Sequence, residues 1–184
     1  LLVPFGRLAD LVGRKRIYAL GLSFDITGAI LGALAPSASL LILARVVQGV
    51  GGAMIFGTGV AILTSVYPPQ TRGHALGLTT AATYTGLSLG PVLGGFIVHA
   101  LGWRSIFLAT IPIAATPFIL TTVRLKGEWA DARGERFDFT GSTVFGTGLV
   151  TLMYGFSRLP SSLGLALTAA GVMALAGFVV LELH

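Results

Sequence analysis

The sequence predicts an all-α integral membrane protein, a helical bundle of about six full spans preceded by the end of one further helix. Composition is the first reason: 54% of the 184 residues are hydrophobic, 10% are charged, and the mean hydropathy is +0.87. A soluble domain carries roughly 25% charged residues and needs polar side chains to cover its surface. The second reason is length, because the apolar stretches reach the ~20 residues that cross a bilayer core about 30 Å thick.

Six apolar stretches follow a short apolar stub at residues 1–5. We expect membrane-spanning helices over 17–35, 40–67, 75–98, 105–122, 139–157 and 163–181. The stub has the composition of the last residues of an earlier helix, so we expect this chain to be a segment of a longer protein. The longest connection between spans is the charged segment 124–138.

The basic residues predict which connections face the cytoplasm, because Lys and Arg accumulate on that side of a membrane protein. One alternate set of connections holds nine of the 12 Lys and Arg residues, and the opposite set holds two. The basic set consists of residues 6–16, 67–74 and 124–138. This asymmetry explains the net charge of +5 without a nucleic-acid partner, which would favour basic residues gathered on one face.

The residues give no support for an enzyme or for a metal site. The chain has no Cys, which excludes a thiolate metal site within it. Neither Lys follows Gly as a phosphate-binding loop requires, and no Gly-x-Gly continues into a dinucleotide fingerprint. The three His residues lie far apart at loop positions. We therefore expect no catalytic residues, no metal and no cofactor.

Residues 6–16 concentrate charge in an apolar chain, since five of its 19 charged residues lie in GRLADLVGRKR. Glycine permits a tight loop between antiparallel helices. We expect Asp10 to accept hydrogen bonds at the N-terminal end of a helix, where the helix dipole favours negative charge, and Arg14 to meet an acidic or carbonyl partner. The candidate residues of this first pattern are Gly6, Asp10, Gly13, Arg14, Lys15 and Arg16.

A second pattern lies inside the span 40–67, in LILARVVQGVGG. Arg45 and Gln48 recur with two glycines at i, i+3, i+4 and i+7, so they share one helix face. A stripe of polar and small residues faces protein or a cavity rather than lipid. Arg45 lies only about five residues into its span, so snorkelling of its guanidinium to the membrane interface is the alternative.

A third pattern is GLSLGPVLGG at residues 86–95. Its glycines at i, i+4 and i+8 predict a smooth stripe where another helix backbone approaches closely. A proline inside the span bends the helix, which a membrane bundle tolerates. Ordinary helix packing is the alternative, because Gly-x-x-x-Gly also occurs at 28–32 and 73–77. The candidate residues are Gly86, Gly90, Pro91, Gly94 and Gly95.

Asp25 is a carboxylate about eight residues into the span 17–35. A carboxylate inside a membrane suggests a functional site, here for a proton or a substrate. Counting along the two helices puts Asp25 and Arg45 about 10 Å apart in depth, so they need not pair. Asp25 belongs to none of the three patterns, which favours a structural carboxylate over a substrate-binding one.

The three patterns resemble motifs of the major facilitator superfamily: its loop between helices two and three, its fourth-helix motif, and the fifth-helix motif of its antiporters. The short charged linker is similar to that of the fourteen-helix drug/proton antiporters. The resemblance implies that residues 1–122 are part of the N-terminal six-helix bundle, from the end of helix 2 to helix 6. It makes 123–138 a cytoplasmic linker and 139–184 an extra helix pair, helices 7 and 8.

The resemblance also implies a function and residue roles. The protein would sit in the cell membrane as a monomer and export amphipathic, often cationic, drugs in exchange for protons by alternating access, with the proton gradient as its energy source. The first pattern would be a conformational latch, and the third would mark an antiporter. Arg45 and Gln48 would serve proton coupling, with Arg45 favouring the charged form of a nearby acid. A symporter or uniporter for a metabolite such as a sugar or organic acid is the alternative.

Overall fold

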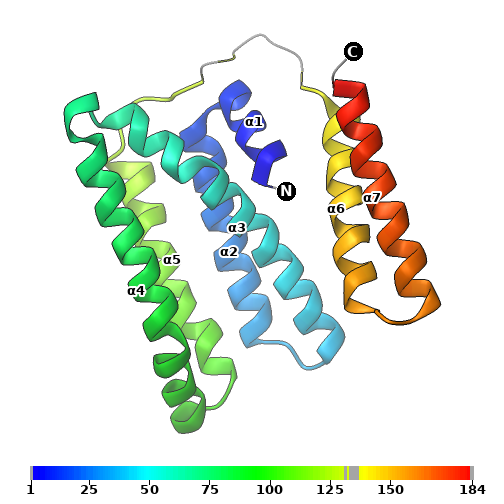
Figure 1. The fold of residues 1–184 in the computed structure, drawn as a ribbon. Helices are drawn as coiled ribbons and strands as arrows, with labels where there is room; N and C mark the ends of the chain where they lie inside the picture. The colour runs from blue at the N-terminus through cyan, green and yellow to red at the C-terminus, as the bar shows by residue number, and fades with distance from the viewer. Residues whose placement is uncertain (1, 131, 133–136, 183–184) are drawn as a thin grey trace. The chain divides into compact units, whose positions relative to one another are not determined.

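The computed structural model describes residues 2–130, 132 and 137–182, with side chains through residue 180. Within these residues the chain forms seven helices and no strand (Figure 1). The helices are α1 (Leu2–Val12), α2 (Arg14–Ala33), α3 (Ala38–Val66), α4 (Pro69–Leu101), α5 (Arg104–Val123), α6 (Phe139–Ser157) and α7 (Ser162–Glu182). The prediction of an all-α bundle is confirmed.

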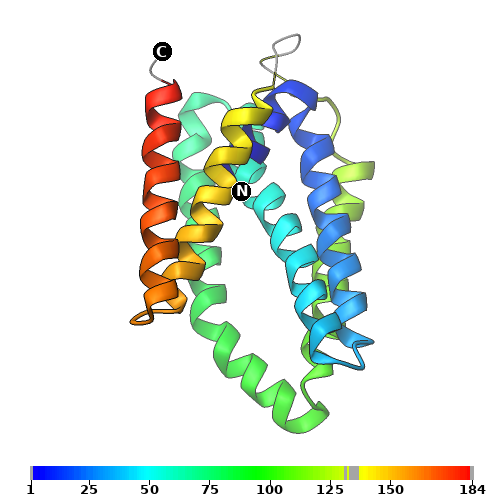
Figure 2. The same ribbon diagram turned by 90° about the vertical axis from the view of Figure 1, so that its right-hand side faces the viewer.

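The chain divides into two compact units, Leu1–Gly134 and Glu135–His184. In the first unit, α2 packs against both α3 and α5, and α1 packs against α2 and α3 (Figure 1, Figure 2). Helix α4 contacts α3 and α5 and diverges from α3 with distance from their connection (Figure 1). The second unit is a hairpin of α6 and α7.

Within the part of the chain that the structure describes, four helices are long and apolar enough to cross a membrane by length and composition: α3, α4, α5 and residues Ser162–Val180 of α7. Helices α2 and α6 have 20 and 19 residues, which is also a spanning length. Both are less apolar, because α2 opens with three basic residues and contains Asp25, while α6 is rich in glycine and threonine. The six-span arrangement therefore stays a prediction for these two helices.

The prediction of an eleven-residue loop at 6–16 is wrong. Helix α1 continues to Val12 and α2 begins at Arg14, so Gly13 alone connects them. The helix continues because the intervening residues are mostly Arg, Leu and Ala, which favour helix whether or not lipid surrounds them. It stops at Gly13, whose φ of 129° and ψ of 127° suit only glycine. Helix α4 likewise begins inside the predicted loop 67–74, because Pro69 has the φ of a first helical turn.

Glycines bring α2 and α3 into backbone contact. A Cβ atom added to Gly51 would lie 2.6 Å from the carbonyl oxygen of Gly21, and one added to Gly21 would lie 2.8 Å from that of Gly51. Real Cβ contacts are longer, so any larger residue at either position would push the helices apart. Nearby, Ala9, Ile17 and Met54 form a buried apolar cluster that joins α1, α2 and α3.

The α6–α7 hairpin is also closely packed. Asp138 begins α6, because its carboxylate accepts a hydrogen bond from the N–H of Gly141 at 2.9 Å. A Cβ on Gly171 of α7 would lie 2.6 Å from the backbone nitrogen of Leu152 in α6. The rings of Phe145 and Phe178 lie 5.3 Å apart between the two helices. The hairpin thus has its own packing contacts within the second unit.

Candidate functional site

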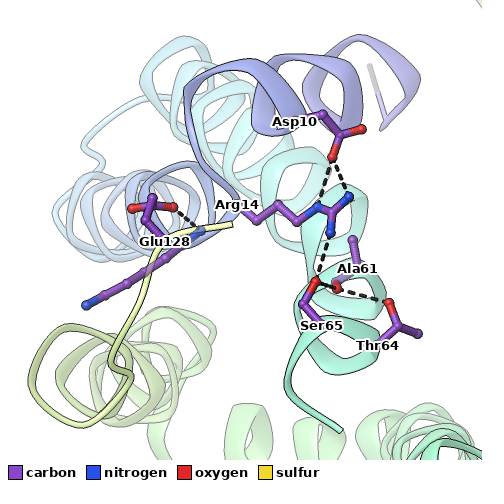
Figure 3. A network of polar contacts seen from close by, with 7 residues as sticks. Asp10, Arg14, Ala61, Thr64, Ser65 and Glu128 are labelled. Atoms are coloured by element: carbon purple, nitrogen blue, oxygen red, sulfur yellow. Dashed lines mark hydrogen bonds and ion pairs between the residues drawn. The ribbon is translucent and has the colours of Figure 1, made fainter. Parts of the chain in front are cut away.

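An ion pair joins the helices on either side of Gly13. Nε of Arg14 donates to Oδ1 of Asp10 at 2.8 Å, and Nη2 lies 2.7 Å from the same oxygen (Figure 3). Nη1 of Arg14 donates to Oγ of Ser65 in α3 at 2.8 Å, and that hydroxyl in turn donates to the carbonyl oxygen of Ala61. One guanidinium therefore connects α1, α2 and α3, as its fork of donors allows.

Residues 124–130 and 132, which follow α5, lie against this junction. Oε1 of Glu128 accepts a hydrogen bond from the N–H group of Lys15 at 2.9 Å (Figure 3). It also accepts one from the N–H group of Arg16 at 3.4 Å. These are among the first N–H groups of α2, which have no partner within the helix, and the helix dipole favours a negative charge there. Glu128 thus caps α2, the role that the sequence suggested for Asp10.

Backbone hydrogen bonds strengthen the same contact. The N–H of Arg14 donates to the carbonyl oxygen of Trp129 at 2.8 Å, and the N–H of Ala132 donates to that of Asp10 at 3.0 Å. Nζ of Lys15 donates to the carbonyl oxygen of Leu125 at 2.7 Å. We call residues 124–130 and 132 the strap. No sequence pattern predicts this docking, because Glu128 lies 112 residues from Arg16 and has the pattern of one solvated charge among several.

The first-pattern glycines have different structural roles. Gly13 makes the sharp connection described above, and it also leaves room for Glu128. Gly6 lies inside α1 against α3, where an added Cβ would be 3.5 Å from the carbonyl oxygen of Gly57. That distance is an ordinary contact, so Gly6 permits close approach without requiring a special backbone conformation.

The second pattern is a contact pair on α3. Nη1 of Arg45 donates to Oε1 of Gln48 at 3.2 Å. The guanidinium carbon of Arg45 also lies 4.6 Å from the centre of the Phe107 ring in α5, a cation–π distance. Arg45, Phe107 and Trp103 help to line an open groove of about 630 Å³ between α3 and α5. Arg45 therefore contacts side chains of α3 and α5, which snorkelling to the membrane interface would not require.

Asp25 comes within reach of this pair. Nε2 of Gln48 donates to Oδ1 of Asp25 at 3.2 Å. Gln48 thus hydrogen-bonds to Asp25 with one end of its amide and to Arg45 with the other. Sequence counting separated Asp25 from Arg45 in depth and missed this link, because a glutamine one helical turn from Arg45 spans the gap.

The third pattern makes no close contact in the described part of the chain. Gly86, Gly90, Gly94 and Gly95 lie in α4, and an added Cβ at any of them would meet no atom within 4 Å. Pro91 lies within the same continuous helix and is exposed. The structure therefore does not bring these residues to Arg45 or to the Gly13 junction. Across the described residues, no group of three or more His, Cys, Asp or Glu side chains is placed to hold a metal ion.

The long apolar helices of the described residues define a multi-pass helical membrane protein. The model of the Major Facilitator Superfamily matches residues 1–181, and the chain belongs to this superfamily of membrane transporters. The chain spans 28% to 39% of the length of the curated relatives that it matches.

Three relatives illustrate the range of named functions. Multidrug resistance protein Stp of Mycobacterium tuberculosis is 38% identical over 83% of this chain and 28% of its own length. Riboflavin transporter RibZ of Clostridioides difficile is 36% identical over 77% of this chain and 31% of its own length. A probable actinorhodin transporter of Streptomyces coelicolor is 33% identical and covers all of this chain with 33% of its own length.

Proposed function

We propose that the complete protein exports amphipathic, often cationic, small molecules in exchange for protons, by alternating access of a midplane site. The observation that carries the proposal is the polar contact of Arg45 with Gln48 inside α3, a helix apolar enough to span a membrane. A charge in such a helix is costly and is retained where it serves transport. The names of the relatives, a multidrug resistance protein and a probable actinorhodin transporter among them, support small-molecule export.

The residue roles follow the same proposal. Arg45 and Gln48 couple transport to protons, and the glycines around Pro91 line the face of α4 that another helix of the complete protein approaches. The residues Gly6, Asp10, Gly13, Arg14, Lys15 and Arg16 form a cytoplasmic latch that holds one access state. The Arg14 contacts with α1 and α3 support this role, because they would have to break or move as a unit when the helices shift.

The proposed arrangement has fourteen helices in a monomer. Residues 1–122 contribute the end of helix 2 to helix 6, and 139–184 contribute the pair between the two halves. The separate packing of α6 against α7 supports that division. Segments 6–16, 67–74 and 124–138 face the cytoplasm.

The test is efflux of a cationic dye from cells that express the complete gene. We expect efflux to stop when a protonophore collapses the gradient. Replacing Arg45 by alanine should abolish efflux while the protein stays in the membrane at its normal level. Arg158→Ala is the matched control, because the Arg158 guanidinium contacts Tyr154 within its own hairpin. Wild-type efflux that ignores the protonophore would overturn the antiport proposal.

Transport of a metabolite without proton exchange is the second candidate. The relative named a riboflavin transporter favours it, because that protein shares 36% identity with this chain. Flavin uptake by the same cells, together with dye efflux that ignores the protonophore, would favour this candidate over export by exchange.

A further inference from the structure

The contacts of Gln48 form a continuous polar line across two helices. Asp25 on α2 accepts a hydrogen bond from the Gln48 amide nitrogen, and the Gln48 amide oxygen accepts one from Arg45, each at 3.2 Å. A side-chain amide can donate a hydrogen bond from its nitrogen and accept one at its oxygen without itself ionising. Gln48 is therefore a neutral link between the acidic side chain of Asp25 and the basic side chain of Arg45.

Backbone packing holds this line in place. The Gln48 side chain crosses α2 at Gly28, where an added Cβ would lie 2.4 Å from Cγ of Gln48 and 2.8 Å from the carbonyl oxygen of Ala44. On the other side of Asp25, a Cβ on Gly51 would lie 2.8 Å from the Asp25 backbone nitrogen. Gly28 and Gly51 thus let the backbones of α2 and α3 approach closely on both sides of Asp25. This close packing of the two helices keeps Asp25 and Gln48 near each other.

Helices α1, α3 and α5 pack against α2. Of their charged side chains, Arg45 on α3 is the one that is linked to Asp25, through Gln48. The charged side chains of α1 (Arg7, Asp10) and of the strap (Arg124, Lys126, Glu128) belong to the region where α2 begins. Asp25 lies 11 residues after Arg14, or about 16 Å along the helix. On α5, Arg104 donates to the carbonyl oxygen of Ala35, beyond the far end of α2, and Arg124 follows the last residue of α5. Among the described residues, Arg45 is thus the charged side chain whose positive charge can offset a negative charge on Asp25.

We propose that Asp25 carries the proton exchanged during transport, and that Gln48 transmits its charge state to Arg45. This inference rests on the proposed proton-coupled export. With Asp25 ionised, its negative charge offsets the Arg45 guanidinium, and the groove beside Phe107 can accept a cation. When the Asp25 carboxylate takes up one proton from water, it becomes neutral, while Arg45 keeps its positive charge. The unbalanced positive charge then repels a bound cation, so proton and cargo exclude one another.

Asp25→Asn separates a protonation role from a structural one. Asparagine keeps an oxygen that can accept from Gln48, but it cannot take up the proton. We expect the purified complete Asp25→Asn protein to fold and to lose gradient-driven dye exchange in reconstituted vesicles. Asp25→Glu should restore gradient-driven exchange with a displaced pH profile. Thr27→Val is the matched control, because the Thr27 hydroxyl donates to the carbonyl oxygen of Ser23 in its own helix, and its exchange should equal that of the wild type.

Three outcomes separate the possible failures. Wild-type exchange that ignores the gradient overturns the proposed function, and this inference with it. Gradient-driven wild-type exchange together with a fully active Asp25→Asn protein overturns this inference alone. Loss of exchange in Asp25→Asn, with rescue by Asp25→Glu and an unaffected Thr27→Val protein, supports it.

A measurement on the unmodified protein covers the case in which Asp25→Asn fails to fold. Dicyclohexylcarbodiimide reacts with protonated carboxyl groups in apolar surroundings, and mass spectrometry locates the adduct. We expect labelling of Asp25 to rise as the pH falls and to decrease when the cationic dye is present. Labelling of Asp25 that is absent, or that is independent of both pH and dye, contradicts the inference.

Discussion

Replacing Gly13 by alanine should weaken the α1–α2 junction and release the strap from it. Gly13 has a φ of 129°, which an L residue rarely adopts. A Cβ there would lie 2.4 Å from Oε1 and 2.8 Å from Cγ of Glu128. The Glu128 side chain must therefore move away, and it would lose its hydrogen bonds to the N–H groups of Lys15 and Arg16.

The size of the effect follows from these contacts. Backbone strain of this kind costs about 1–3 kcal/mol. Loss of a side-chain cap at a helix N-terminus costs about 0.5–2 kcal/mol. The ion pair between Arg16 and Glu128 adds little, because the Arg16 side chain is 66% exposed. We therefore expect Gly13→Ala to lower the free energy of unfolding by about 2–4 kcal/mol, with strain as the larger part.

Equilibrium unfolding of the purified complete protein in mixed detergent and sodium dodecyl sulfate measures this loss. Gly6→Ala is the matched control: it lies in the same pattern, and its added Cβ would make an ordinary 3.5 Å contact. In a Glu128→Ala background the cap is already gone, so Gly13→Ala should cost about 1 kcal/mol less than it does alone. Equal losses for Gly6→Ala and Gly13→Ala, or strict additivity with Glu128→Ala, would refute the reasoning.

Two further changes test the packing around the same helices. Gly51→Ala places a Cβ 2.6 Å from a backbone oxygen of α2 and should destabilise the protein by about 1–3 kcal/mol, whereas Gly52→Ala, with no atom of this part of the chain within 4 Å, should have no such effect in the same unfolding assay. Arg14→Lys keeps the charge but cannot bond α1 and α3 through one planar fork, so we expect a loss of about 1–2 kcal/mol. A lysine variant as stable as the wild type would contradict that assignment.

Sequence patterns predicted individual elements well where local chemistry decides them. The predicted span 139–157 coincides with α6, because Asp138 caps its first turn at the end of the charged segment. The same reasoning fails at residues 6–16, where the concentration of charge predicts a loop and the structure has helix. Arg and Leu form helix readily on both sides of a membrane surface, so charge marks where a span ends and not where a helix ends.

The contact partners of the candidate residues are predicted less well than the candidate residues themselves. Arg14, Arg45 and Gln48 were identified from their spacing, and each makes a polar side-chain contact in the structure. Glu128 is not predicted, because it belongs to no pattern. It contacts α2 because the end of α5 lies near the start of α2 in the folded chain. From the sequence Asp25 is only a weak candidate, because depth along separate helices does not reveal what a long side chain can bridge.

The sequence by itself determined that the chain lies in a membrane, that it is helical, and which family it resembles. Composition, span length and three motifs suffice for these, because each is a property of residues near one another in the chain. Only the tertiary structure decided which groups meet: Asp25 with Gln48 across the glycine-lined crossing of α2 and α3, and Glu128 with the first turn of α2. GRLADLVGRKR is therefore a one-glycine junction whose contacts come from α3 and the strap. Such contacts depend on how whole helices pack, and no local run of residues carries that information.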